Sequence, residues 1–264
     1  MLSTLLTQTR YQLLSYVRTP RALLSGVLTP VVLMVLLAAI SDSRHESGYA
    51  GRLTAAMVTL GLVSLGFTTL AGAVTAARDR GTLKRLRATP LPIWLYLAGQ
   101  VAATVIVIVV QSAGLVALGV LVYGAELDTG RLPISAAGIL LGAVTISVCG
   151  LAIAQLVPRS EAAAPVLSAV MLPVTLVSGI FFPVAALPDW VAWIGDSLPL
   201  SHLGALLSAG FTDGAWAPGI TWHPADFAWL AGWAVLGFAY TRWRFRSEPA
   251  TPKRGRRPVP ADVV

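Results

Sequence analysis

Long stretches without charge constrain this chain of 264 residues more than any other feature. Five of them contain no Asp, Glu, Lys or Arg, at residues 22–41, 53–77, 88–125, 132–158 and 162–188. A helix rises about 1.5 Å per residue, so about 20 apolar residues cross a hydrocarbon core of about 30 Å. Hydrocarbon cannot satisfy exposed backbone N–H and C=O groups, which favours helices as the spanning structure. The pattern therefore predicts an all-α membrane protein.

We expect six transmembrane helices, because small and aromatic residues extend a shorter uncharged stretch at 227–241. The predicted spans are roughly 22–41, 54–77, 98–123, 134–157, 163–183 and 225–243. The composition agrees, with 56% hydrophobic and only 12% charged residues. An average soluble domain has about 25% charged residues. The polar residues of this chain are too few to cover a soluble globule of this length.

The positions of the basic residues predict the orientation of the spans. With the N-terminus in the cytoplasm, 16 of the 19 Lys and Arg residues lie on the cytoplasmic side, and only Arg44, Arg52 and Arg131 lie outside. Cytoplasmic loops of membrane proteins carry such an excess of Lys and Arg, so both termini are expected in the cytoplasm. The net charge of +7 could indicate nucleic acid, but the charges sit at the ends of apolar runs. We therefore expect no nucleic-acid partner.

Three segments outside the spans have their own character. Residues 1–18 place leucines at helical spacing and precede Thr19-Pro20, which predicts an amphipathic interfacial helix. Residues 184–224 hold four of the eight tryptophans and several prolines, which predicts short, re-entrant-like external helices before the last span. The basic, proline-rich tail at 247–264 is expected to be disordered and attracted to anionic lipids. Residues 1–246 are expected to form a single transmembrane domain.

No residue cluster indicates catalysis, a cofactor or a metal. His45, His202 and His223 are scattered and lack the spacing of metal ligands. The G-x-x-x-x-G-K-[ST] pattern that cradles phosphates does not occur, so the chain is not expected to hydrolyse ATP by itself. The predicted spans also carry no deep carboxylate of the kind that ion-coupled carriers use. If the chain drives uphill transport, the energy must come from another subunit.

A short basic segment, RDRGTLKRLRATP at residues 78–90, separates two of the apolar runs. Gly81 relaxes the helix after the second span, and Thr89-Pro90 ends whatever helix follows. A short helix between them would carry Leu83 and Leu86 on one face. The charges alone could equally be a topology signal that holds this loop inside.

This segment resembles the loop of ABC-2 type transporter permeases, whose usual form is E-R-E-R-G-T-L-E-R-L-x-x-T-P. The stretch SGIFFPVAALPDWVAWIGDSLPLSHL at 178–203 is similar to a second motif of that family, S-G-x-x-F-P…L-P-x-W…P-L. The likeness covers nearly the whole chain. It departs from the family pattern at Ala77, where an acid is common, and at Lys84, where glutamate is common.

The resemblance implies a multi-pass subunit of a bacterial plasma-membrane exporter. Two permease chains, identical or paralogous, would pair above two P-loop ABC ATPase subunits, and ATP and Mg would be bound by those ATPases. It implies that a cytoplasmic coupling helix contacts the ATPase through Arg78, Asp79, Arg80, Gly81, Thr82, Leu83, Arg85, Leu86, Thr89 and Pro90. It also implies an external gate or re-entrant segment that includes Phe181, Phe182, Pro183, Pro188, Trp190, Trp193 and Pro199.

The branch that the chain resembles most is the daunorubicin-type, multidrug-resistance exporters, which implies a lipophilic or amphiphilic cargo. Exporters of polysaccharides or glycolipids in the same superfamily are an alternative. A membrane protein without an ATPase, such as an immunity or scaffold protein, is an alternative from another class. A membrane enzyme is a further one. The identity of the cargo and the choice between homodimer and heterodimer cannot be read from the sequence.

Overall fold

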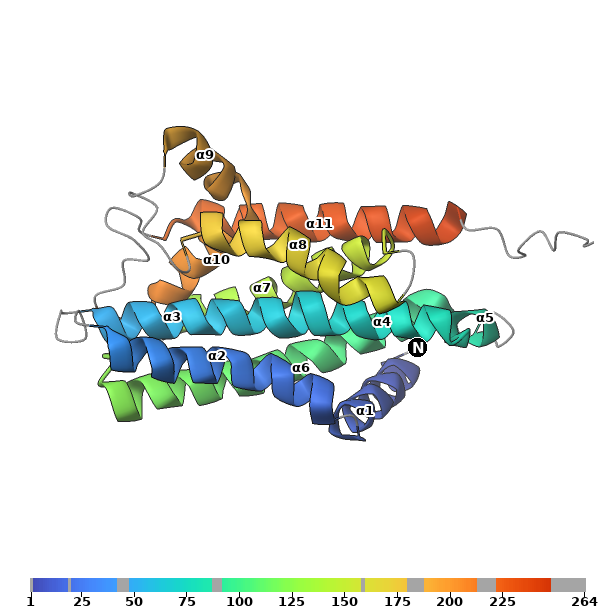
Figure 1. The fold of residues 1–264 in the computed structure, drawn as a ribbon, viewed down its shortest axis with the longest axis horizontal. Helices are drawn as coiled ribbons and strands as arrows, with labels where there is room; N and C mark the ends of the chain where they lie inside the picture. Colours follow the sequence, from blue (N-terminus) through green and yellow to red (C-terminus); the bar gives the residue numbers. More distant parts are fainter. Residues whose placement is uncertain are drawn as a thin grey trace, which may run out of the picture.

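The computed structural model of the chain describes residues 2–18, 20–41, 48–86, 92–157, 160–179, 188–212 and 222–247. These residues form helices and their connections, with one isolated bridge between Leu127 and Phe211. The expected all-α class is therefore confirmed. The long helices lie side by side along one axis of the molecule (Figure 1).

The helices follow one another in a simple order along the chain. They are α1 (Leu2–Arg18), α2 (Pro20–Ile40), α3 (Tyr49–Leu62), the π-helix η2 (Val63–Thr69), α4 (Leu70–Asp79), α5 (Thr82–Leu86), α6 (Ile93–Tyr123), α7 (Leu132–Ala154), the 3-10 turn η3 (Ser160–Ala162), α8 (Ala163–Val177), α9 (Asp189–Ser197), α10 (Pro199–Ser208) and α11 (Pro224–Ser247). The segments α3, η2 and α4 join without interruption into one helix of 31 residues.

The two ends of the bundle differ in charge. One end, which we call the basic end, carries α5, the last turns of α11 and the residues Arg78, Arg80, Arg85 and Arg242. The N-terminus lies at this end as well (Figure 1). The opposite end, which we call the acidic end, carries α9 and α10 and the residues Glu126, Asp128, Asp196 and Asp226. This separation of charge is typical of a protein whose apolar middle crosses a bilayer.

Four helices among the described residues are long and apolar enough to cross a membrane. They are Tyr49–Asp79, Ile93–Tyr123, Leu132–Ala154 and Ser160–Val177. The apolar part of α2, Gly26–Ile40, is shorter than these four helices, and α11 is not among them. The six-span count therefore stays a prediction.

Two helices have other bounds than the predicted spans. Helix α8 ends at Val177, before residue 183, and Gly179 follows with φ 82°, a conformation that favours glycine. Helix α6 begins at Ile93, before residue 98, directly after Pro92, whose backbone is extended. Where the spans begin and end in a membrane stays a prediction.

Helix α7 packs closely on its neighbours through small residues. A Cβ atom at Gly150 would lie 2.7 Å from the carbonyl oxygen of Gly66 and 2.8 Å from Cα of Phe67, both in η2. A Cβ atom at Gly142 would lie 2.4 Å from Cδ1 of Leu203 in α10. Small residues permit such close helix contacts in membranes, where hydrophobic burial adds little driving force. The glycines of α7 therefore set how near η2 and α10 can approach.

The helix expected at the N-terminus is present as α1, and α2 begins at Pro20 as the Thr19-Pro20 break predicts. Helix α1 packs against α6, where Gly99, which has no side chain, makes room for the side chain of Gln8. The hydroxyls of Tyr16 and Thr104 lie 2.7 Å apart and share a hydrogen bond. Burial raises the pKa of the Tyr16 hydroxyl above its usual value, and this hydrogen bond opposes the shift.

We expect Gly150→Ala to lower the thermal stability of the purified protein in detergent. The added methyl group meets backbone atoms of η2, which cannot rotate away, and overpacking of this kind costs about 1–3 kcal/mol. Gly114→Ala on α6 is the matched control, because a Cβ atom there has no atom within 4 Å. Equal melting temperatures for the two variants would contradict the close contact of α7 with η2.

Candidate functional site

The basic segment forms a turn and a short helix at the end of the helix made of α3, η2 and α4. Helix α4 ends at Asp79, and Arg80 and Gly81 form the turn that leads into α5. Gly81 has φ 71°, in the left-handed region. The N–H of Arg85 donates to the carbonyl of Gly81 at 3.1 Å. The short helix expected after Gly81 is thus present, while Thr89 and Pro90 lie outside the described residues.

Two side chains of the segment tie the tip of α4 to the connection between α7 and α8. The guanidinium of Arg78 donates to the carbonyls of Ala154, at 3.5 Å, and of Val157. The carboxylate of Asp79 accepts a hydrogen bond from the N–H of Ser160. Ala154 is the last residue of α7, so its carbonyl has no hydrogen-bond partner within that helix, and Arg78 satisfies it. The positive charge of Arg78 is also favoured there, because the C-terminal end of a helix attracts cations. Arg78 therefore acts as an internal clamp in this structure.

The other members of the predicted coupling set divide between surface and interior. Arg80 and Arg85 are exposed, and Arg85 Nη2 donates to the carbonyl of Arg80 at 3.0 Å. Leu86 is half-buried against an apolar cluster of α4, α6 and α7 that includes Val74 and Leu97. The side chain of Leu83 lies outside the described part of the structure. Charged groups of the turn, rather than Leu86, thus face outward.

The comparison with known families agrees with this arrangement. The family described as ABC-2 type transporter matches residues 4–212, which is most of the chain and includes the basic segment and α10. The chain belongs to the ABC-2 type transporter family. Members of this family are membrane permeases that normally work with an ABC ATPase. The chain is accordingly a multi-pass membrane protein.

A curated relative points the same way. The chain is 26% identical over 149 residues to the Bacillus subtilis (strain 168) protein named "Putative transport permease YvfS". The aligned region covers 56% of this chain and 60% of that relative. The match therefore spans less than two thirds of the relative's length.

The helix that leads to the basic segment of this ABC-2 permease runs the length of the bundle. Its 31 residues span about 46 Å at the usual rise per residue. The π-helix η2 forms the part of it that contacts α7, and Thr69 Oγ1 donates to the carbonyl of Ser64 at 2.9 Å, five residues back. Single π-helical turns inside α-helices are frequent at functional sites. One continuous helix thus connects the basic end with the acidic end.

At the acidic end, the segment that the sequence predicts to be external contains one exposed and one buried helix. Trp190 and Trp193 on α9 are 69% and 73% exposed, and Pro188 precedes that helix. Helix α10, which begins with Pro199, is buried along most of its length between α3, α7 and α11. The expected short helices before the last helix are present, while Phe181, Phe182 and Pro183 lie outside the described residues.

A polar network that the sequence analysis did not predict holds α10 to α11. His202 Nδ1 lies 2.7 Å from Oδ1 of Asp226, and His202 Nε2 lies 2.7 Å from the carbonyl oxygen of Asp196. Asp226 is 6% exposed, and its second oxygen accepts the N–H of His223 at 2.6 Å. The partner of Nε2 is a backbone carbonyl, which only accepts, so His202 Nε2 is the donor in that contact.

Aromatic contacts complete this external network. The rings of His202 and Trp229 stack with centroids 5.4 Å apart and an interplanar angle of 8°. Trp233 Nε1 donates to the carbonyl of Ser197 at 3.1 Å, which binds the end of α9 to α11. Asp226 and His202 lie 24 positions apart on two helices, so no local pattern could have paired them.

The described residues hold no group of three or more His, Cys, Asp or Glu side chains that could bind a metal ion. Among the described residues, the hydrogen-bond partners of the His202–Asp226 pair include the backbone of Asp196 and His223 and no serine or cysteine side chain. The pair connects α10 to the start of α11.

We expect Asp226→Asn to destabilise the acidic end. The variant loses the charge on a buried hydrogen-bonded group and leaves one donor without an acceptor, which costs about 1.5–3 kcal/mol. Thermal unfolding in detergent measures the loss. Asp196→Asn is the control, because the side chain of Asp196 is exposed and only its backbone carbonyl meets His202. A melting temperature for Asp226→Asn that equals that of the control would show that the network contributes nothing.

Proposed function

We propose that this permease is the membrane subunit of an ATP-driven exporter, with two copies of a separate ABC ATPase bound at the basic end. The observation that carries the proposal is the short helix α5, joined through Gly81 to a helix that runs the length of the bundle. In this proposal the basic end faces the cytoplasm, as the positive-inside rule favours. The exposed Arg80 and Arg85 side chains support it, because they offer charge to an incoming subunit.

The clamp formed by Arg78 and Asp79 supports a rigid-body mechanism. It couples the tip of α4 to the connection that leads into α8, so a push on α5 would move α4 and α8 together. Packed helices shift between discrete arrangements rather than deform continuously. ATP binding in the partner would thereby alter the distance between helices on the two sides of a pathway.

We further propose that two permease chains pair and that the cargo is lipophilic or amphiphilic. Apolar side chains on α2 and α8 are exposed in the single chain, among them Val32, Leu36 and Leu172. Such surface is available either to lipid or to a second copy with cargo between the two. Arg21 is the one acidic or basic residue in the described parts of these two helices, and its side chain lies outside the described residues. This lack of charge favours an uncharged pathway wall. A glycolipid-like cargo is the alternative.

Gly81→Pro and Leu83→Asp are expected to abolish transport while the protein still inserts into the membrane. Proline cannot adopt φ 71° and removes the N–H that donates to Arg78, so α5 would change direction. The measurement is transport into inside-out vesicles that contain the permease and its ATPase. Thr4→Asp, which places the same new charge on an exposed position of α1, is the control for Leu83→Asp. Normal transport by both α5 variants would rule out the coupling role.

We expect an ABC ATPase encoded beside this chain to copurify with it and to hydrolyse ATP faster when lipophilic drugs are added. The assay compares drugs with glycolipids in vesicles of one lipid composition. Stimulation by glycolipids alone would favour the alternative cargo. A permease that purifies without any ATPase from cells that express both would contradict the proposed function.

A further inference from the structure

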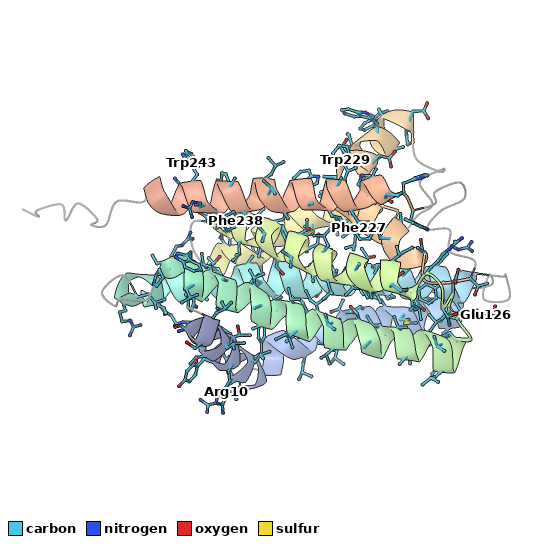
Figure 2. The ribbon with its side chains drawn as sticks, turned by 180° about the vertical axis from the view of Figure 1, so that it is seen from behind. Arg10, Glu126, Phe227, Trp229, Phe238 and Trp243 are labelled. Carbon is cyan, nitrogen blue, oxygen red and sulfur yellow. The ribbon has the colours of Figure 1, made fainter. Side chains whose placement is uncertain are left out.

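An apolar groove lies on the outer face of the bundle between α6, α7 and α11. Its volume is about 920 Å³. Its walls include Ala98 and Ala102 of α6, Val148 of α7 and Phe238 of α11. Figure 2 shows α6, α7 and α11 toward the viewer, with Phe238 on the side of α11 that faces α7. Helices α2 and α8 lie toward the viewer in the opposite view (Figure 1), so the groove is not on the face proposed for pairing and cargo.

The groove occupies the half of the molecule next to the basic end. On α6 it extends from Ile93 to Ile106, which is about 20 Å along the helix. That length matches one leaflet of a bilayer, including its headgroup region. Trp94 stands at the outer margin of the groove and is 52% exposed, and tryptophan favours the headgroup level. The groove thus runs from headgroup depth toward the bilayer centre.

Polar groups gather only at the headgroup end of the groove. Arg242 lines that end, is exposed, and forms no ion pair with any residue that the structure describes. Thr241 beside it is 7% exposed, and its hydroxyl has no hydrogen-bond partner among the described residues. None of the described residues that line the groove is Asp or Glu. A buried hydroxyl without a partner next to a cation indicates a missing polar ligand.

We propose that this groove binds one anionic phospholipid from the leaflet at the basic end. An acyl chain fills the apolar length between α6 and α11, and the phosphate pairs with the guanidinium of Arg242. Guanidinium groups bind phosphate oxygens in a bidentate geometry, which gives the site its preference for an anionic headgroup. The proposal does not depend on the identity of the cargo or on the ATPase.

Lipid binding to the purified full-length chain tests the proposal. Native mass spectrometry from mild detergent would count bound lipids after addition of phosphatidylglycerol or of phosphatidylcholine with the same acyl chains. We expect the wild type to retain one phosphatidylglycerol in preference to phosphatidylcholine. Arg242→Gln should weaken phosphatidylglycerol binding about fivefold, the effect of one basic residue near a membrane surface. Arg244→Gln, which removes the same charge outside the groove lining, should weaken it less than twofold.

Ala102→Leu tests the apolar part of the site, because it fills the groove without changing charge. We expect it to reduce the binding of both lipids, while thermal unfolding without added lipid confirms that the variant folds. Ala98→Leu, one turn away on the same wall, gives a second test if the first variant is unstable. Equal effects of Arg242→Gln and Arg244→Gln would overturn the proposal in favour of diffuse surface attraction. Unchanged lipid binding in both Ala98→Leu and Ala102→Leu would overturn it as well. A change in the oligomeric mass of these variants with no loss of bound lipid would also overturn it.

Discussion

Hydrocarbon offers no hydrogen-bond partner, so the polar groups of spanning helices must be satisfied within the chain. Three threonines of the long helices follow this constraint: Thr59, Thr75 and Thr145 each donate to the carbonyl four residues earlier. Helices whose polar groups are satisfied in this way attract one another mainly by close packing of small residues. The contact of Gly150 with the backbone of η2 is such a packing point, and α7 also packs against α4, α6, α10 and α11.

Hydrogen bonds between distant segments lie at both ends of the bundle and in its middle. At the basic end, Arg78 and Asp79 bind α4 to the start of the α8 segment. At the acidic end, His202 and Asp226 bind α10 to α11, and Ser135 Oγ donates to the carbonyl of Leu206. In the middle, Gln111 Nε2 donates to the carbonyl of Gly26 at 3.3 Å, and Thr145 Oγ1 donates to that of Leu230 at 3.1 Å. A structure of this kind suits rigid-body movement of whole helices, which is what the proposed coupling requires.

Part of the candidate site could be predicted from the sequence alone. Gly81 followed by leucines at helical spacing predicts the short helix, because a turn with positive φ and a local apolar pattern are properties of neighbouring residues. The roles of Arg78 and Leu86 could not be predicted in the same way. The basic run makes Arg78 look like a surface charge, yet it reaches carbonyls about 76 positions away. Leu86 looks like a partner contact, yet it packs against the apolar cluster that α4, α6 and α7 form.

The sequence by itself determined the helical class, the basic and acidic ends and the position of the turn at Gly81. These features depend on residues that are neighbours in the sequence. Uncharged runs transfer into hydrocarbon as helices, and glycine and proline set the backbone conformation where they occur. Only the tertiary structure decided which charges are bound internally, where η2 meets α7, and that His202 faces Asp226. Those pairings depend on the rotation and crossing of helices far apart in the chain. The interactions that stabilise them join side chains that are not neighbours in the sequence.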